Sequence, residues 1–454
     1  MTRSPRSRWL MAAAGASSVA LALAGCSSSS GGDTASGDGS AASTDCAAYE
    51  SYGDLSGKTV NVYASILSPE LEMYEAAYVP FEECTGANIQ FEGSNEFEAQ
   101  LKVREKAGNP PDIALIPQPG LLANMVATGS VVTPNAQTET NVDENWSPDW
   151  KAYGVVDGTF YAPPNSSNLK SLVWYSPQMF ADNGWEIPTT WDELKTLTDT
   201  IVASQVVDKP WCAGIGSGDA TGWPITDWVE DVMLRMYGTD VYDQWVNHEI
   251  PFNDPQVAAA FDEVGYFLKN PDYVNGGYGD VRSIATTSFQ DGGLTILDGT
   301  CALHRQAQFY GAQWPEGTNV AEDGDVFAFY LPAMDPTTAP VLGGGEFITA
   351  FSDRPEVLAA QEWMSTADYA NSVARNSRGI ASANLNADAN LYEGLAAVAQ
   401  KAFVDPGSQF RFDGSDAMPA AVGQGSFWVG ATDWITGKST QDTLDFIENS
   451  WPAS

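Results

Sequence analysis

The chain alternates between short apolar runs, which predict strands, and longer stretches with helical periodicity. In the first part of the chain, strands are predicted at 59–67, 88–93 and 112–117. Helices are predicted between and after them at 69–84, 95–107 and 120–128, the second of them capped by Ser94 or Asn95. Strands that alternate with helices are typical of a parallel or mixed sheet covered by helices. The fold class predicted from this pattern is α/β.

A second alternating unit begins after residues 160–162. Strands are predicted there at 170–175, 211–215, 293–297 and 325–331, and helices at 191–204, 224–237, 255–268, 355–366 and 441–449. Two α/β units on one chain commonly leave a crevice between them, where loops meet at the ends of strands. We therefore expect a ligand to bind in such a crevice.

The composition supports a folded protein and excludes two classes of partner. Of the 454 residues, 43% are hydrophobic and 11% aromatic, which is ample material for a core. Lys and Arg number 21 against 59 Asp and Glu, giving a net charge of −38. This balance argues against binding to nucleic acid or to an anionic membrane surface. With only two histidines, His248 and His304, a His-rich metal site and a histidine-based triad are not expected.

The first residues have the pattern of an export signal. Three arginines precede an apolar run at 9–24, which ends in Leu23-Ala24-Gly25-Cys26. This ending resembles a bacterial lipobox, which implies cleavage before Cys26 and its acylation, with palmitate among the fatty acids; an ordinary signal peptide with a chance cysteine is the alternative. Residues 26–45 are rich in Ser, Gly and Ala and predict a flexible tether. Removal of 1–25 leaves 18 basic against 59 acidic residues, a net charge of −41.

Four further cysteines, Cys46, Cys84, Cys212 and Cys301, indicate disulfides in an exported chain. Four cysteines permit three connectivities, and the sequence does not select one of them. We favour Cys46 with Cys84, at the end of a predicted helix, and Cys212 with Cys301, in two short apolar segments. None has the Cys-x-x-Cys spacing of redox or zinc motifs.

The segment 214–228 combines glycines with two tryptophans at the opening of a predicted helix. Glycines let backbone amides approach a ligand, and the faces of Trp223 and Trp228 suit the apolar faces of sugar rings. Asp227 or Asp219 would accept hydrogen bonds from sugar hydroxyls. The alternative is that both tryptophans pack in the core. The glycines do not match a phosphate-binding loop, and we expect no nucleotide, metal or other cofactor.

Further polar and aromatic residues gather in predicted loops at 118–120, 163–165, 306–310, 343–346, 413–416 and 427–428. Together they indicate a polar cleft lined with aromatic rings. Paired carboxylates among aromatic residues are also what a glycoside hydrolase needs. With 59 acidic residues, however, some pair is always found, and motifs of hydrolases and metalloproteases are absent from the sequence.

Several runs resemble one family over nearly all of residues 58–454. They are the lipobox with its tether, Ala-Gly-Asn-Pro-Pro-Asp-Ile-Ala-Leu-Ile-Pro at 107–117, and Trp-Tyr at 174–175 through Pro-Thr-Thr-Trp-Asp-Glu-Leu at 188–194. These resemble the extracellular sugar-binding lipoproteins of ABC importers, the maltose-binding-protein-like group. The runs at 222–228, 351–357 and 412–419 are most similar to the α-glucoside-binding subgroup.

The resemblance implies a type II periplasmic-binding-protein fold, in which two α/β lobes are joined by a hinge with a ligand cleft between them. One lobe would comprise 46–162 with 343–395, and the other 163–342 with 396–454. The chain would then cross between lobes near Ala162, Gly343 and Leu395.

The resemblance also implies positions for the cleft residues. Trp223 and Trp228 would line it, Gln308 and Phe309 would stand where a ring-stacking residue is found in the family, and Phe427 with Trp428 would form a further stacking position. Gln118 and Asn165 would face the cleft from strand ends, and Gly344, Gly345 and Glu346 would lie at a crossing. Asp227, Glu346 and Asp416 are our candidates for hydroxyl acceptors. Maltose-binding relatives frequently have Trp where this chain has Gln308 and Phe309.

The function implied is an extracytoplasmic receptor, anchored to the outer face of the cell membrane through Cys26, that captures an oligosaccharide by hinge closure. The oligosaccharide would be an α-glucoside. The partners implied are two ABC permease subunits and, through them, a cytoplasmic ATPase, and the receptor itself is expected to be a monomer. The alternatives are a membrane-anchored glycoside hydrolase and a receptor for a non-sugar ligand such as a polyol or a peptide.

Overall fold

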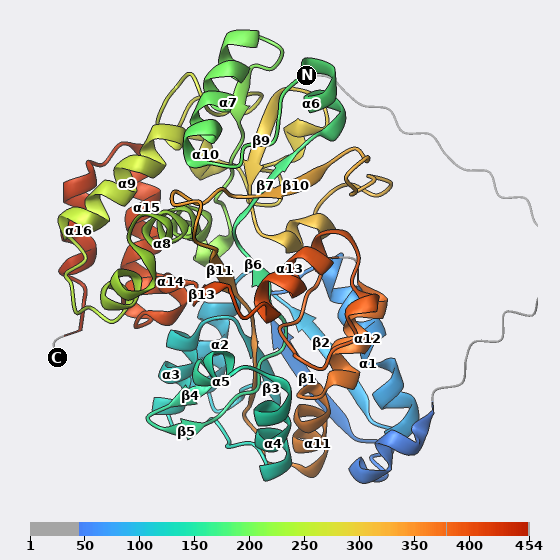
Figure 1. The fold of residues 1–454 in the computed structure, drawn as a ribbon. Helices are drawn as coiled ribbons and strands as arrows, with labels where there is room; N and C mark the ends of the chain where they lie inside the picture. The colour runs from blue at the N-terminus through green and yellow to red at the C-terminus, as the bar shows by residue number, and fades with distance from the viewer. Residues whose placement is uncertain (1–44, 378, 453–454) are drawn as a thin grey trace, which may run out of the picture. The chain divides into compact units, whose positions relative to one another are not determined.

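The computed structural model describes residues 45–377 and 379–452, and its first sheet is built largely from the N-terminal part of this range (Figure 1). Strands β1 (Thr59–Ala64), β2 (Asn88–Gly93) and β3 (Ile113–Ile116) are parallel, and β12 (Phe347–Ala350) joins β3 in the antiparallel sense. The order is β12-β3-β1-β2. The helices that accompany this sheet are α1 (Glu70–Thr85), α2 (Phe97–Lys106), α3 (Pro119–Ala127), α11 (Pro355–Met364) and α12 (Ala367–Asn376).

Both faces of this sheet are buried, which explains the continuous apolar run in β3. Ile113 and Leu115 pack in a cluster that includes Phe81 and Trp363, whose rings stack with centroids 5.0 Å apart. Ala114 and Ile116 belong to a second cluster on the other face. A strand covered by helices on both faces has no solvent-facing positions and so does not alternate between apolar and polar residues.

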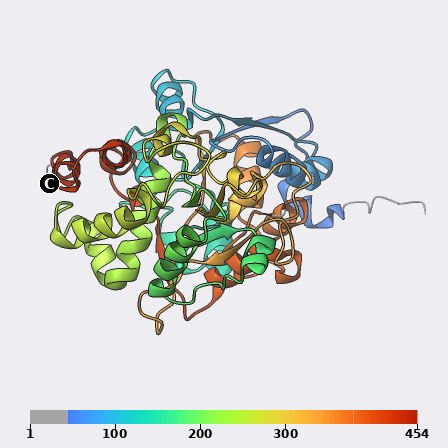
Figure 2. The same ribbon diagram turned by 90° about the horizontal axis from the view of Figure 1, so that it is seen from above.

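The second sheet has the order β10-β7-β9-β8. Its strands are β7 (Leu172–Tyr175), β8 (Lys209–Trp211), β9 (Cys301–Arg305) and β10 (Phe327–Tyr330); β8 and β9 are parallel and the other pairs antiparallel. Its helices include α6 (Pro177–Asn183), α7 (Trp191–Ser204), α8 (Trp223–Val246), α9 (Pro255–Leu268) and α10 (Ser283–Thr286). The C-terminal helices α15 (Trp428–Thr436) and α16 (Thr440–Glu448) lie against α8 and α9 (Figure 2).

A third sheet has the order β13-β11-β6 and brings together distant parts of the chain. Its strands are β6 (Asn168–Leu169), β11 (Pro340–Gly344) and β13 (Gln409–Phe412). Only Gly345 and Glu346 separate β11 from β12, so the chain passes directly from the third sheet to the first. The remaining elements include α4 (Ala136–Asn145), α5 (Pro148–Ala152), β4 (Val155–Val156), β5 (Thr159–Phe160), α13 (Gly394–Val404) and α14 (Gly414–Ala417).

The elements with strong local signals lie where the sequence predicts them. The predicted bounds of β2, α7 and α9 are those observed. Helix α7 begins with a capping box between Thr190 and Glu193, and the Asp254 side chain caps α9. Helix α8 starts within one residue of the predicted position, and its helical backbone is interrupted at Gly238, where φ is +74°.

Three predictions are wrong in detail. Residues 293–297 form no strand but a 3-10 turn, Leu294–Ile296, because the amides of Ile296 and Leu297 bond three residues back. The strand of the second sheet in this part of the chain is β9, between β7 and β8. Strand β8 ends at Trp211 rather than continuing to 215. Helix α2 starts at Phe97, and neither Ser94 nor Asn95 caps it.

The structure forms the two disulfides that we favoured, Cys46 with Cys84 and Cys212 with Cys301. The first ties the 3-10 helix Cys46–Tyr52 to the end of α1, and the second joins the end of β8 to the start of β9. The export signal, the lipidation of Cys26 and the tether up to residue 44 lie outside the described residues. Among the residues that are described, no helix has both the length and the apolar character needed to cross a bilayer.

Candidate functional site

A cavity of about 480 Å³ lies where the three parallel strands of the first sheet end. Ser65–Ser68 follow β1, Asn95 follows β2, and Gln118 follows β3. The carboxyl ends of parallel strands share one edge of a sheet, which is why these segments meet there. The other walls come from several distant segments of the chain. They are 216–218 and 220–221 before α8, Trp223 at its start, 288–290, Phe309, 344–346 between β11 and β12, and Asp413 and Asp416.

Three aromatic side chains form one wall of the cavity. The Trp223 ring centroid lies 5.2 Å from that of Phe289 and 6.1 Å from that of Phe309, and the two phenylalanine rings are 6.2 Å apart. The Phe289 ring meets each of the other two edge to face, and each ring is partly exposed. An apolar wall of this kind suits a ligand with an apolar face.

Carboxyl groups supply much of the polar wall. Glu98 accepts a hydrogen bond from Gln118 Nε2 at 2.9 Å, and Glu346 accepts one from the Ser166 hydroxyl. Burial raises the pKa of both Glu98 and Glu346. Burial together with the neighbouring Glu346 raises the pKa of Glu70 to about 8. These groups are therefore held in surroundings that favour the protonated form or a hydrogen-bonding partner.

A buried ionic cluster forms part of the cavity wall and extends behind it. Lys170 Nζ lies 2.7 Å from Asp413 Oδ2 and 3.0 Å from Asp227 Oδ1, and Arg305 Nη1 lies 3.4 Å from Asp227 Oδ2. Burial opposes ionisation of Asp413, yet the ammonium of Lys170 holds the pKa of that carboxyl below its ordinary value. The Lys170 ammonium also lies 5.1 Å from the Trp223 ring centroid, so it joins the cluster to the aromatic wall.

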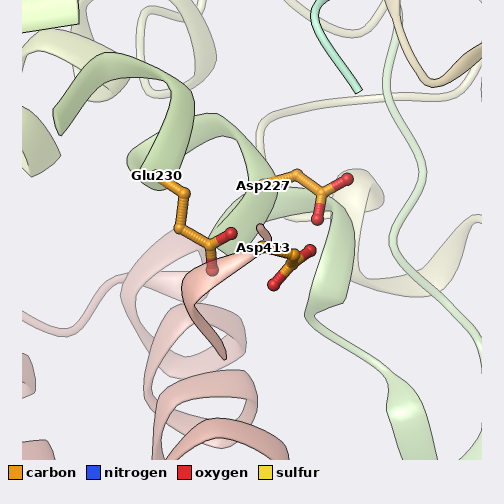
Figure 3. Close-up of side chains that lie close together, drawn as sticks. All are labelled: Asp227, Glu230 and Asp413. Carbon is orange, nitrogen blue, oxygen red and sulfur yellow. The ribbon is translucent and has the colours of Figure 1, made fainter. Parts of the chain in front are cut away.

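The carboxyl groups of Asp227, Glu230 and Asp413 converge (Figure 3), and their oxygens lie within 4.8 Å of one another. This group does not fit a metal ion. Lys170 already donates to two of the three carboxylates, and the two Glu230 oxygens accept from the amides of Gly414 and Ser415 at 3.0 and 2.9 Å. Burial, with the neighbouring Asp413 and Asp227, raises the pKa of Glu230 well above its ordinary value.

Eight of the twelve ligand-binding residues predicted from the sequence line the cavity. They are Gln118, Trp223, Phe309, Gly344, Gly345, Glu346, Asp416 and Trp428. Asp416 is buried, and burial next to Asp413 raises its pKa well above the ordinary value. Residues from all three sheets or their flanking loops are thus brought to one place.

The structure does not bring Asn165, Asp227, Trp228 and Gln308 to the cavity wall. Trp228 packs in the core, 5.4 Å from the Trp211 ring and 5.7 Å from that of Phe267. Asp227 is fully buried and neutralises Lys170 and Arg305.

The other two of these side chains hold backbone or tyrosines in place. Asn165 Oδ1 accepts from the Tyr369 hydroxyl at 2.7 Å. Gln308 donates to the Ser167 carbonyl at 2.9 Å and accepts from the Leu169 amide. Asp219, the alternative to Asp227, is exposed and does not line the cavity.

Several lining residues were missed by sequence reasoning. The main ones are Glu70, Glu98, Lys170 and Phe289. Glu98 carries a usable signal, because it lies on the buried side of α2 with Phe97 and Leu101, where an acid needs a partner. Lys170 carries a similar one, as a cation beside a run of apolar strand residues. We find no such signal for Phe289.

The family follows from the sequence match as well as from the fold. Residues 65–367 match the model of the bacterial extracellular solute-binding proteins. The chain belongs to this family of bacterial extracellular solute-binding proteins. The family that the resemblance predicted is thereby confirmed.

Two relatives cover most of this solute-binding protein. The alpha-glucosides-binding periplasmic protein AglE of Rhizobium meliloti is 37% identical over 410 residues, 88% of each chain. The osmoprotective compounds-binding protein GgtB of Synechocystis sp. is also 37% identical, over 421 residues that cover 90% of this chain and 96% of the relative. Family and relatives are binding proteins, so the chain is a receptor and not the glycoside hydrolase that the sequence left open.

The fold of the solute-binding protein is that of solved sugar receptors. The structure of the receptor AcbH, described as preferring β-D-galactopyranose, superposes with a TM-score of 0.70 at 17% identity, over 87% of this chain and 97% of that one. This similarity confirms the expected type II periplasmic-binding fold with two lobes.

Proposed function

We propose that the chain is the sugar-binding receptor of an ABC importer and that it captures an α-glucoside in the cavity of about 480 Å³. The observation that carries this proposal is the pairing of an aromatic wall with hydrogen-bonding carboxyl and amide groups. Sugar rings present apolar C–H faces and hydroxyl edges, which these two kinds of wall match. The similarity to AglE, named for alpha-glucosides, supports the choice of ligand.

Capture would occur by hinge closure between two lobes. We assign 46–162 with 343–395 to one lobe and 163–342 with 396–454 to the other. The cavity walls then come from both, with Gln118 and Glu98 on one side and Trp223 and Phe309 on the other. A sugar that contacts both sides only in the closed form binds that form more tightly and shifts the population toward it.

The closed receptor would deliver its sugar to two permease subunits coupled to a cytoplasmic ATPase. We assign it to the outer face of the cell membrane as a monomer held by lipidated Cys26. Tethering keeps the receptor near the permeases, which raises its effective concentration there. Loss of retention in the membrane fraction after Cys26→Ala would test the anchor.

Thermal-shift and calorimetric measurements with maltose, isomaltose, trehalose and sucrose test the ligand class. A ligand at 100 times its dissociation constant stabilises the protein by about 2.7 kcal/mol. We expect at least one of these α-glucosides to raise the melting temperature and to remain unconverted after long incubation. If none binds, the assignment of ligand class fails.

Trp223→Ala tests the site itself. We expect the affinity for the disaccharide that binds to fall at least tenfold, because the ring that closes the aromatic wall is lost. Phe446→Ala, which removes an exposed ring on α16, is the matched control and should bind as wild type does. Equal affinity in both variants would place the sugar elsewhere.

A second candidate is an osmoprotective solute, favoured by the similarity to GgtB. A polyol carries the same hydroxyl groups as a sugar but offers no rigid ring face to stack on Trp223. Including sorbitol and glycerol in the same calorimetric series separates the two. Binding of a polyol with no binding of any disaccharide would favour this second candidate.

A further inference from the structure

The side chains around the cavity are strongly unbalanced in charge. Five carboxyl groups line it, those of Glu70, Glu98, Glu346, Asp413 and Asp416. Among the described lining residues, Lys170 is the one cation. A cavity that binds neutral sugars through their hydroxyl groups needs hydrogen-bond acceptors, but it does not need this excess of acidic side chains.

The charge of Lys170 is already balanced by two carboxylates. Its ammonium group lies between Asp413 and Asp227, at 2.7 and 3.0 Å, and both of these carboxylates are buried. Within the described part of the chain, the other four lining carboxyl groups form no ion pair. They therefore have no cation from the described residues within ion-pairing distance, and the ammonium of Lys170 acts on Glu346 and Asp416 only from farther away.

These four carboxyl groups are also poor in hydrogen bonds. Glu98 is held by Gln118 and Glu346 by Ser166. The side chains of Glu70 and Asp416 make no hydrogen bond within residues 45–377 and 379–452. Gln118 is 4% exposed, and its Oε1, which lacks a partner, is a further acceptor at the cavity.

The carboxyl groups repel one another across the cavity. Glu346 raises the pKa of Glu70, and Glu98 contributes to the raised pKa of Asp416, in each case in addition to burial. A positive group placed among them would relieve this repulsion and fill the vacant acceptors. A negative group would increase it.

We propose that the cavity selects its ligand by charge, so that a glycoside with a protonated amine in place of a hydroxyl binds well and one with a carboxylate is rejected. This inference rests on the proposed function, because it takes a glycoside as the ligand. It extends that function by naming a class of amino-sugar glycosides as ligands and a class of acidic glycosides as excluded. The unpaired acids disfavour a glycoside that carries a carboxylate. Gln118 and the aromatic wall can contact neutral and cationic glycosides alike.

Matched ligands provide the test. Maltose, trehalose and sucrose are each compared with the 6-amino-6-deoxy analogue and with the 6-uronate by calorimetry. Amine and hydroxyl are similar in size, and the uronate replaces one CH₂OH group by a carboxylate, so shape changes little. For the disaccharide that binds, we expect the uronate to have a dissociation constant at least tenfold above that of the amine.

Variants separate charge from fit. In Glu70→Gln and Glu98→Gln the ratio of the two dissociation constants should fall at least threefold, because glutamine has nearly the same shape but cannot ionise to pair with a bound amine, as the buried glutamic acid can. Glu75→Gln, an exposed site on α1 outside the cavity, is the matched control and should keep the wild-type ratio. Thermal melts of each variant show which of the two is folded, and either one suffices.

The outcomes distinguish this inference from the proposed function. If no neutral disaccharide binds, the proposed function fails and the inference fails with it. If a neutral disaccharide binds but the ratio is below tenfold, or stays unchanged in both folded variants, the charge selection alone is overturned. A ratio above tenfold that falls in a folded variant and not in Glu75→Gln supports it.

Discussion

Lys170 Nζ lies 2.7 Å from Asp413 Oδ2, and this ion pair joins the segment that follows β6 to the turn that follows β13. A second bond, 3.0 Å to Asp227, ties the same ammonium to α8. The three residues are far apart in sequence and lie together at the cavity, which Lys170 and Asp413 line. The positions of the cavity-lining Trp223 and Asp416 therefore depend on a buried charge cluster rather than on local structure alone.

Removal of this cation should be strongly destabilising. Lys170→Met leaves two buried carboxylates without their ammonium, and breaking a buried pair in this way typically lowers the free energy of unfolding by about 3–5 kcal/mol. Urea denaturation followed by tryptophan fluorescence measures the change. Lys151→Met is the control, because Lys151 also contacts two carboxylates, Glu139 and Asp143, but on the surface. There we expect less than about 1 kcal/mol, and equal losses would contradict the structural role of Lys170.

The sequence predicted those elements whose signals lie within their own residues and missed those that depend on distant partners. Helices α7 and α9 carry their caps and their apolar periodicity within their own residues, and their bounds were predicted correctly. Strands β11 and β12 were not predicted, because their partners are distant: β12 pairs with β3, more than 200 residues earlier. The three glycines at 343–345, at the end of β11 and directly after it, also give the local pattern of a loop.

The candidate site shows the same division. Positions 223 and 228 are five residues apart, which places them about 140° apart around an α-helix of 3.6 residues per turn. Both could not face one cavity, and the helix phase alone identifies one of them as a core residue. That Trp223 is the one at the cavity, and that Phe289 joins it, depends on how α8 packs, which the sequence pattern does not contain.

The crossing between β11 and β12 should tolerate substitution very unevenly. A Cβ at Gly345 would lie 2.1 Å from the Ser166 carbonyl oxygen, so Gly345→Ala must displace the backbone. A Cβ at Gly344 would meet only the Lys170 side chain, 3.1 Å from its Cε, and a shift of a few tenths of an ångström would relieve that contact. We expect Gly345→Ala to lower the free energy of unfolding by about 1–3 kcal/mol and Gly344→Ala by less than about 1 kcal/mol, in the range known for overpacking. Chemical denaturation measures both values. If the two variants lose the same free energy of unfolding, the backbone at Gly345 adjusts to a Cβ as readily as the surroundings of Gly344 do.

The two disulfides should differ in their effect on ligand binding. They close loops of 38 and 89 residues, for which the chain-entropy account gives stabilisation of about 4 and about 5 kcal/mol. Cys212 is followed by residues 216–218, which line the cavity, whereas Cys46 and Cys84 lie at the far end of α1 from Glu70. The double variant Cys212→Ala/Cys301→Ala should therefore lose both stability and sugar affinity. Cys46→Ala/Cys84→Ala should lose stability alone.

Urea denaturation and calorimetry with the best-binding disaccharide separate the two effects. The second double variant is the matched control for the first, since each removes one bond between backbone segments. Unchanged affinity in both variants would mean that the disulfide at β8 does not position the cavity segment.

Glu70 should make the stability of the ligand-free protein depend on pH. Burial and Glu346 raise its pKa from 4.5 to about 8. Between these values the folded state holds a proton that the unfolded state has released, so the contribution of Glu70 to stability is complete below about pH 4.5 and is lost as the pH rises to about 8. In Glu70→Gln this loss is absent. The fall in melting temperature from pH 5 to pH 8.5 should therefore be smaller than in wild type, by about 2 °C or more. Glu75→Gln, exposed on the same helix, should follow the wild-type profile; if Glu70→Gln follows it too, Glu70 is ionised at neutral pH and its surroundings at the cavity are more polar than the structure implies.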